Sequence, residues 1–295
     1  MQTIIPQSES LPWCRTQKGR LVNLYSHFGV SGSPFSVAPD PRFAYPTMPM
    51  NLALANIAYS VDEHRGLFLL QGEIGTGKTT LGRFLMHNWQ QEPDKYVAAQ
   101  IQDPSATSQA GFLRKILAAF EQPTPRYLDP LHAALLAFLL KNREENRTVV
   151  LLLDEAQTIP APGLDLLHTL ANHQSLNDQL IQVVLLAQTN IIHKLDQRPA
   201  LKSRIVGEAY LGPLPFQDAL AMLRHRMQVV DGKFDQVFPD ETHKPIYNAT
   251  KGIPRELCVL ADAALVAAFS LGQKRVGCDT LDAVFSSMRS KGWTR

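Results

Sequence analysis

Between residues 66 and 211 the chain alternates between two patterns of apolar positions. Short unbroken apolar runs are typical of strands buried on both faces of a sheet, and a spacing of three to four is typical of helices with one buried face. We predict strands at residues 66–71, 95–102, 148–153, 182–188 and 208–211. We predict helices at residues 51–60, 80–90, 110–120, 130–142 and 163–173. Strands that alternate with helices indicate a doubly wound α/β domain with a parallel sheet.

After residue 215 the strand pattern stops, and only helical spacing remains. Helices are predicted at residues 216–230, 244–250, 255–271 and 280–288, which indicates a small all-helical second domain. We therefore divide the chain into an N-terminal extension (1–24), an α/β core (25–214) and a helical lid (215–295). Residues 25–46 are rich in aromatic residues and prolines, and the prolines forbid a regular helix. We expect them to form an ordered irregular segment docked on the α/β core.

The stretch GEIGTGKTT at residues 72–80 fits the phosphate-binding pattern G-x-x-x-x-G-K-[ST]. It lies between a predicted strand and a predicted helix, which is the context that this motif requires. Its glycines let backbone N–H groups surround a phosphate at a helix N-terminus. Lys78 can reach the β- and γ-phosphates of a nucleotide, and the Thr79 hydroxyl can hold Mg²⁺. The residues that we expect to contact nucleotide here are Gly72, Glu73, Ile74, Gly75, Thr76, Gly77, Lys78, Thr79 and Thr80.

A pair of acids, Asp154 and Glu155, directly follows the apolar run at residues 149–153. In open α/β sheets ligands bind outside the carboxyl ends of the strands, which places these acids beside the phosphate loop. Asp154 would hold Mg²⁺, and Glu155 would polarise the attacking water. The alternative is structural, because two acids after a strand also suit the first turn of a helix.

Composition and charge restrict the class of protein only weakly. Apolar residues make up 45% of the chain and charged residues 19%, as in ordinary soluble globular proteins. The net charge of +2 gives no sign of a strong nucleic-acid footprint. The N-terminus lacks a secretory signal, and the apolar helical stretch at 133–140 is shorter than the ~18 residues of a membrane span. We therefore expect a cytoplasmic protein without a membrane span.

The order of phosphate loop, acids, polar strand end and helical region resembles that of AAA+ ATPases. In that family a polar residue at the tip of the strand after the acidic one contacts the γ-phosphate or its water. Here the resemblance assigns this role to Gln188, with Asn190 as the alternative. The family also places an arginine before the last strand, where it reaches the nucleotide of a neighbouring subunit. Arg204, in the sequence Ser203-Arg204, fits this position, and Arg198 is its rival.

The sequence Gly252-Ile253-Pro254-Arg255 resembles the G-x-P-R motif of the lid in the same family. There the arginine folds back onto the nucleotide. A cation in the first turn of a helix opposes the helix dipole, so a nearby anion would explain Arg255. An exposed surface arginine is the alternative interpretation.

Residues 27–45 read HFGVSGSPFSVAPDPRFAY and closely resemble the signature F-G-L-x-x-x-P-F-x-x-x-P-D-P-R-F-x-Y of ExeA-type ATPases, the general secretion pathway protein A family. Related proteins include transposition regulators of the TnsC and TniB kind. The resemblance implies ATP and Mg²⁺ as cofactors and self-assembly into a ring or filament. It leaves three functions open: an ExeA-like ATPase that switches or remodels an envelope secretion or pilus machine, a regulator that binds double-stranded DNA and recruits a transposase, and an ATP-binding scaffold with little turnover.

Overall fold

The structure is a computed structural model that describes residues 16–17, 20–21, 24–38, 40–172, 174–175 and 178–290. The chain forms two compact units. We call Pro46–Gly212 the α/β unit, and Met1–Tyr45 together with Pro213–Arg295 the helical unit. Most of the predicted N-terminal extension, residues 1–24, lies outside the described residues, and so does Pro39.

A five-stranded parallel sheet forms the centre of the α/β unit, in the order β4-β5-β8-β3-β9. Its strands are β3 (Leu67–Gly72), β4 (Tyr96–Ile101), β5 (Thr148–Leu153), β8 (Ile181–Ala187) and β9 (Ile205–Leu211). The predicted parallel sheet is thus confirmed. Strand β9 begins three residues earlier than predicted, because this edge strand alternates exposed and half-buried residues and so shows no unbroken apolar run.

The helices of the α/β unit agree with the predicted ones within a few residues. They are α2 (Met48–Asp62), α3 (Lys78–Gln91), α4 (Gln109–Ala119), α5 (Leu128–Glu144), α6 (Ala161–Leu170), α7 (Ile191–Asp196) and α8 (Pro199–Lys202), with the 3₁₀ turn η3 (Ala156–Thr158). The prediction missed α7 and α8, which are too short to show a helical period. A short hairpin, β6 (Gln174–Ser175) with β7 (Asp178–Gln179), precedes β8.

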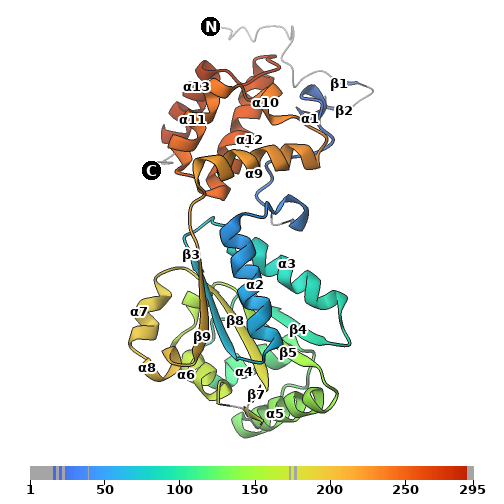
Figure 1. The fold of residues 1–295 in the computed structure, drawn as a ribbon, viewed down its shortest axis with the longest axis vertical. Helices are drawn as coiled ribbons and strands as arrows, with labels where there is room; N and C mark the ends of the chain where they lie inside the picture. The colour runs from blue at the N-terminus through green and yellow to red at the C-terminus, as the bar shows by residue number, and fades with distance from the viewer. Residues whose placement is uncertain are drawn as a thin grey trace, which may run out of the picture. The chain divides into compact units, whose positions relative to one another are not determined.

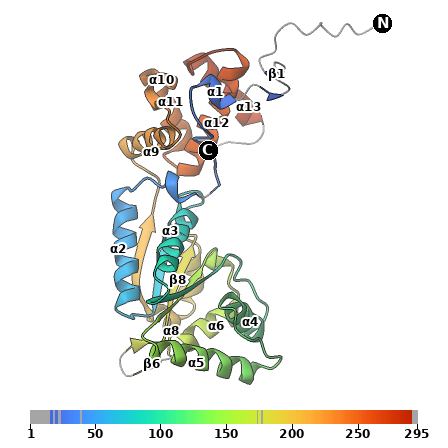
Figure 2. The same cartoon turned by 90° about the vertical axis from the view of Figure 1, so that its right-hand side faces the viewer.

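Both faces of the sheet are covered by helices, which explains the unbroken apolar run of β5. Val149, Leu151 and Leu153 pack into one cluster with α4, α5 and α6. Val150 and Leu152 pack into a second cluster with α2 and α3. These layers can be followed in Figure 1 and, from the side, in Figure 2. Because all five strands are parallel, their carboxyl ends lie along one edge of the sheet.

Helices dominate the second unit, as predicted. They are α9 (Phe216–Val229), α10 (Phe234–Val237), α11 (Asp240–Thr250), α12 (Pro254–Ser270) and α13 (Cys278–Ser290). The unit also contains α1 (Leu24–His27), the 3₁₀ turn η2 (Pro41–Phe43), and the paired strands β1 (Thr16–Gln17) and β2 (Arg20–Leu21). Helix α11 begins before the predicted residue 244, so that Pro245 lies inside it. No helix in the described ranges is long and apolar enough to cross a membrane.

The aromatic segment at residues 25–45 belongs to the helical unit, which corrects our expectation that it docks on the α/β core. Phe35 is 1% exposed and makes an edge-to-face contact with Phe238, with 5.9 Å between ring centroids. The buried Arg226 of α9 donates to the Ser36 carbonyl oxygen (3.2 Å) and stacks 5.0 Å from the Phe43 ring centroid. The side chains of Phe35 and Phe43 therefore form part of the apolar core of the helical unit, together with residues of α9 to α13.

Candidate nucleotide-binding site

The predicted phosphate loop connects β3 to α3. Gly75 and Gly77 have φ angles of 84° and 104°, a backbone conformation that glycine adopts at little cost. A Cβ atom on Gly72 would lie 2.4 Å from the Leu211 carbonyl oxygen of β9, so only glycine fits beside the neighbouring strand. Glu73 and Ile74 are exposed on the loop, and Thr80 is half-buried in the first turn of α3. The loop conformation thus depends on the glycines of the sequence motif.

Lys78 is the first residue of α3, and its ammonium group lies at the loop. Its Nζ atom donates to the carbonyl oxygens of Gly72 and Glu73, each at 2.8 Å. The side chain is buried, which lowers its pKa, while the nearby carboxylates of Glu155, Asp154 and Glu73 act in the opposite direction. A buried cation at a helix N-terminus favours an anionic ligand there.

Asp154 follows the last residue of β5 and is almost fully buried. Its carboxylate accepts hydrogen bonds from the Thr79 hydroxyl and from the Glu155 backbone N–H, the latter at 2.9 Å. Burial raises the pKa of this carboxyl. The Thr79 hydroxyl and the Asp154 carboxylate are therefore in contact. Two such oxygen ligands fit a hard divalent cation such as Mg²⁺.

Glu155 is held in an unusual conformation beside Asp154. Its φ of 51° and ψ of 37° lie in the left-handed region, which costs a non-glycine residue about 1–3 kcal/mol. Its carboxylate accepts hydrogen bonds from the side-chain amides of Gln157 and Gln188, the latter at 3.3 Å. The structure thus brings together the predicted Glu155 and Gln188 at the ends of two adjacent strands.

Gln157 is a site residue that the sequence analysis missed. Its side chain is 8% exposed, and its Oε1 atom accepts the Gln188 backbone N–H at 2.9 Å. Lys194 donates to the Gln157 carbonyl oxygen at 2.6 Å and so fixes the turn after β5. The only signal in the sequence was a polar residue two positions after Glu155. Gln157 therefore connects the acidic turn to the tip of β8.

The two candidates at the tip of β8 differ in their surroundings. Gln188 contacts Glu155, whereas Asn190 precedes α7 and its side chain makes no capping hydrogen bond. Between them, the Thr189 hydroxyl donates to a Glu73 carboxylate oxygen at 3.1 Å, which ties the tip of β8 to the phosphate loop. The geometry favours Gln188 as the residue that shares the site with Glu155.

The two candidate arginines before β9 also differ. The Arg198 guanidinium forms an ion pair with Asp165, with 3.1 Å between Nε and Oδ1. Arg204 follows α8, is exposed, and its guanidinium makes no ion pair within the described part of the chain. Arg255 is exposed in the first turn of α12 and belongs to the helical unit. Of the two residues before β9, only Arg204 thus presents an unpaired guanidinium on the surface.

The chain is similar to known proteins over much of its length. Residues 61–195 match the model of the AAA domain family. The chain is 35% identical over 254 residues to general secretion pathway protein A of Aeromonas hydrophila. The aligned region covers 84% of this chain and 45% of that protein. The chain thus spans about half the length of this relative.

Solved structures share the fold at lower sequence identity. The Aeropyrum pernix ORC2 protein, in ADPNP and ADP complexes, has a TM-score of 0.62 at 19% identity, covering 84% of this chain and 72% of that one. The Aeropyrum pernix ORC1 protein in complex with DNA has a TM-score of 0.64 at 17% identity, covering 87% and 69%. The sheet order, the phosphate loop and the matched domain show a P-loop AAA fold, and over 254 residues the chain is similar to general secretion pathway protein A.

Proposed function

We propose that this protein binds ATP with Mg²⁺ and hydrolyses it as a self-assembled oligomer. The observation that carries the proposal is the cluster at the carboxyl edge of the sheet, where Lys78, the Thr79–Asp154 pair and the Glu155–Gln188 pair meet. Lys78 provides a cation that can bind phosphate, Thr79 and Asp154 provide oxygen ligands for a divalent cation, and Glu155 provides a carboxylate that can activate water.

Each residue of this cluster has a separate role in the proposal. The loop N–H groups and Lys78 bind the phosphates, and Thr79 and Asp154 hold the Mg²⁺, which supplies charge neutralisation. Glu155 orients the attacking water and accepts its proton, while Gln188 fixes the Glu155 carboxylate and reaches the same water. The strained backbone at Glu155 supports this role, because strained residues are common where function requires a side chain in one direction.

We infer that one further cation of each site, the guanidinium of Arg204, comes from a neighbouring subunit. Arg204 is exposed and unpaired, so it can enter the site of a neighbouring subunit, whereas Arg198 is already paired with Asp165. Such an arginine neutralises charge on the transferring phosphoryl group and contributes about 10³- to 10⁵-fold in rate. In this scheme Arg255 contacts the nucleotide of its own subunit.

Mixed oligomers of two variants test whether each site is formed by two neighbouring subunits. Arg204→Ala and Lys78→Ala are each expected to be inactive alone, because each lacks a different half of the site. Mixed oligomers should regain activity at those interfaces where an intact loop meets an intact Arg204. Arg198→Ala serves as the matched control and should retain most of its activity. Failure to recover activity in demonstrably mixed oligomers would contradict the assignment of Arg204.

The ATP-driven step would switch or remodel a partner assembly, as the similarity to general secretion pathway protein A suggests. An envelope secretion or pilus machine is the first candidate for this assembly. Co-purification of the Glu155→Gln variant, which should stay loaded with ATP, with components of such a machine tests this role. Recovery of the same components with Lys78→Ala would show contact that does not depend on nucleotide.

A DNA-dependent role, such as transposition regulation, is a second candidate. It is favoured by the fold that the chain shares with the Aeropyrum pernix ORC1 protein, which was solved with DNA. A subunit of net charge +2 offers few phosphate contacts, so binding must come from repetition of a weak site in the oligomer. Fluorescence anisotropy with labelled duplex should then show cooperative, salt-sensitive binding with ATP and none with ADP. Absence of binding in every nucleotide state at low salt would reject this candidate.

A further inference from the structure

Strand β4 lies at an edge of the sheet, and its outer side is free of any strand in the described residues. On its inner side, the Thr148 N–H donates to Lys95 and the Asp154 N–H donates to Ile101, at 2.8 and 2.9 Å. Backbone groups of successive residues point to opposite sides of a strand, so the odd-numbered residues of β4 bond to β5. The N–H and C=O groups of Ala98 and Gln100 therefore point to the free edge.

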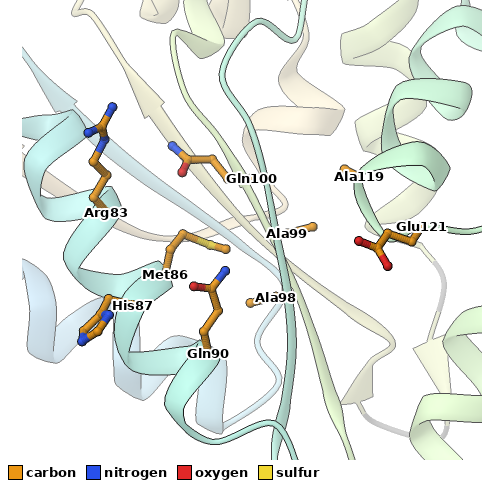
Figure 3. A pocket seen from close by; sticks show the side chains of 9 residues that line it. All are labelled: Arg83, Met86, His87, Gln90, Ala98, Ala99, Gln100, Ala119 and Glu121. Carbon is orange, nitrogen blue, oxygen red and sulfur yellow. The ribbon is translucent and has the colours of Figure 1, made fainter. Parts of the chain in front are cut away.

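Helix α3 lies on one side of this edge and the end of α4 on the other, and together with β4 they line a pocket of about 500 Å³. Figure 3 looks onto β4 with α3 on one side and the end of α4 on the other. Ala98 and Gln100 point toward α3, and Ala99 points toward Ala119. Because Ala98, Ala99 and Ala119 have small side chains, the pocket extends to the backbone of β4. An exposed edge of this kind is a template for pairing with another strand.

The pocket also contains an unsatisfied donor. The Gln100 Nε2 atom is buried and has no hydrogen-bond acceptor in the part of the chain that the structure describes. A buried donor without a partner is costly, and such atoms are rare in native proteins. The Arg83 guanidinium and the His87 imidazole line the same α3 wall, whereas Glu121 lines the opposite wall. An acidic or amide side chain entering beside α3 would supply the acceptor that Gln100 lacks.

We infer that the free edge of β4 binds an extended peptide segment of a partner protein, which adds to the sheet as a further strand. Its backbone would bond to Ala98 and Gln100, and every second side chain would face α3. There an Asp, Glu, Asn or Gln of the peptide would accept from Gln100 Nε2. Main-chain bonds provide the affinity of such strand addition, and alternate side chains provide its specificity. A single extended segment suits a slot with a helical wall on each side better than a second folded copy does.

A proline substitution tests this inference without disturbing the ladder to β5. Ala98→Pro removes an N–H that faces only the free edge, where proline is tolerated. Phage displaying random peptides would be selected on the full-length chain and, in parallel, on Ala98→Pro. Clones enriched on the wild type should carry an acidic or amide residue within an alternating pattern. As free labelled peptides they should bind Ala98→Pro at least about tenfold more weakly by anisotropy. Circular dichroism and affinity for a fluorescent ATP analogue should be the same for both proteins.

A second pair of variants keeps the inference testable if Ala98→Pro fails to fold. Gln100→Glu replaces the buried donor with a carboxylate and should weaken binding of the selected peptides. Gln102→Glu makes the same change at an exposed residue outside the pocket and should leave binding unchanged. Absence of wild-type-enriched clones, or equal binding to all variants, would overturn the inference. Self-association of the wild type that Ala98→Pro abolishes would show that the occupant is a second copy and would likewise overturn it.

Discussion

Replacement of Gln157 by leucine tests whether this side chain holds the catalytic turn. The change leaves the Gln188 backbone N–H, now bonded at 2.9 Å, without its acceptor, which costs about 1–3 kcal/mol. The bond to Glu155 contributes little to stability, because that carboxylate is exposed and water replaces the amide. Burial of leucine at this 8% exposed position offsets about 1 kcal/mol. The net loss is about 0–2 kcal/mol, a decrease in Tm of at most about 8 °C for a domain of this size.

The same substitution should affect turnover more than binding. Without Gln157 the Glu155 carboxylate keeps only the hydrogen bond from the Gln188 amide at 3.3 Å and is less firmly oriented, so kcat should decrease about 10- to 100-fold. ATP affinity should remain within about twofold, because the hydrogen bonds that the structure gives Gln157 go to Glu155, Gln188 and Lys194. Thermal denaturation, a coupled ATPase assay and titration with a fluorescent ATP analogue measure the three quantities, with Gln102→Leu as the control at an exposed glutamine. A variant of lower Tm with unchanged kcat would refute the proposal that Gln157 orients Glu155.

Three further predictions concern the same site. Lys78→Ala should weaken ATP binding at least about 100-fold by titration with a fluorescent analogue, and unchanged affinity would contradict the assignment of the phosphate loop. Glu155→Gln should bind ATP normally and lose turnover, since an amide cannot accept the proton of water; near-normal hydrolysis would leave Glu155 a purely structural residue. Asp154→Asn should raise the Tm of the nucleotide-free protein by about 1–3 °C, because burial raises the pKa of Asp154 and penalises its charged form. That penalty exists above the folded-state pKa and disappears as the pH falls through it, so the difference in Tm should shrink on acidification.

The sheet and the main helices could be predicted because local pattern determines them. The run at residues 149–153 is apolar throughout because both of its faces are buried, and this requirement is visible in the sequence itself. The docking of Phe35 against Phe238 could not be predicted, because apolar composition shows that a segment is buried but not against which partner. Gln157 was missed for a related reason. Its importance comes from Gln188, which is 31 residues away and adjacent only after the sheet has formed.

The helical unit is assembled from two separated parts of the chain, since Phe35 and Phe43 precede the α/β unit and α9 to α13 follow it. During synthesis on the ribosome, the α/β unit has all of its residues once Gly212 has emerged. The aromatic segment must then remain without its apolar partners until the last helices are made. Exposed aromatic side chains at that stage are prone to aggregation, so this order of synthesis creates a demand for chaperones that a contiguous helical domain would not have. Expression of residues 213–295 alone should for the same reason give an incomplete core.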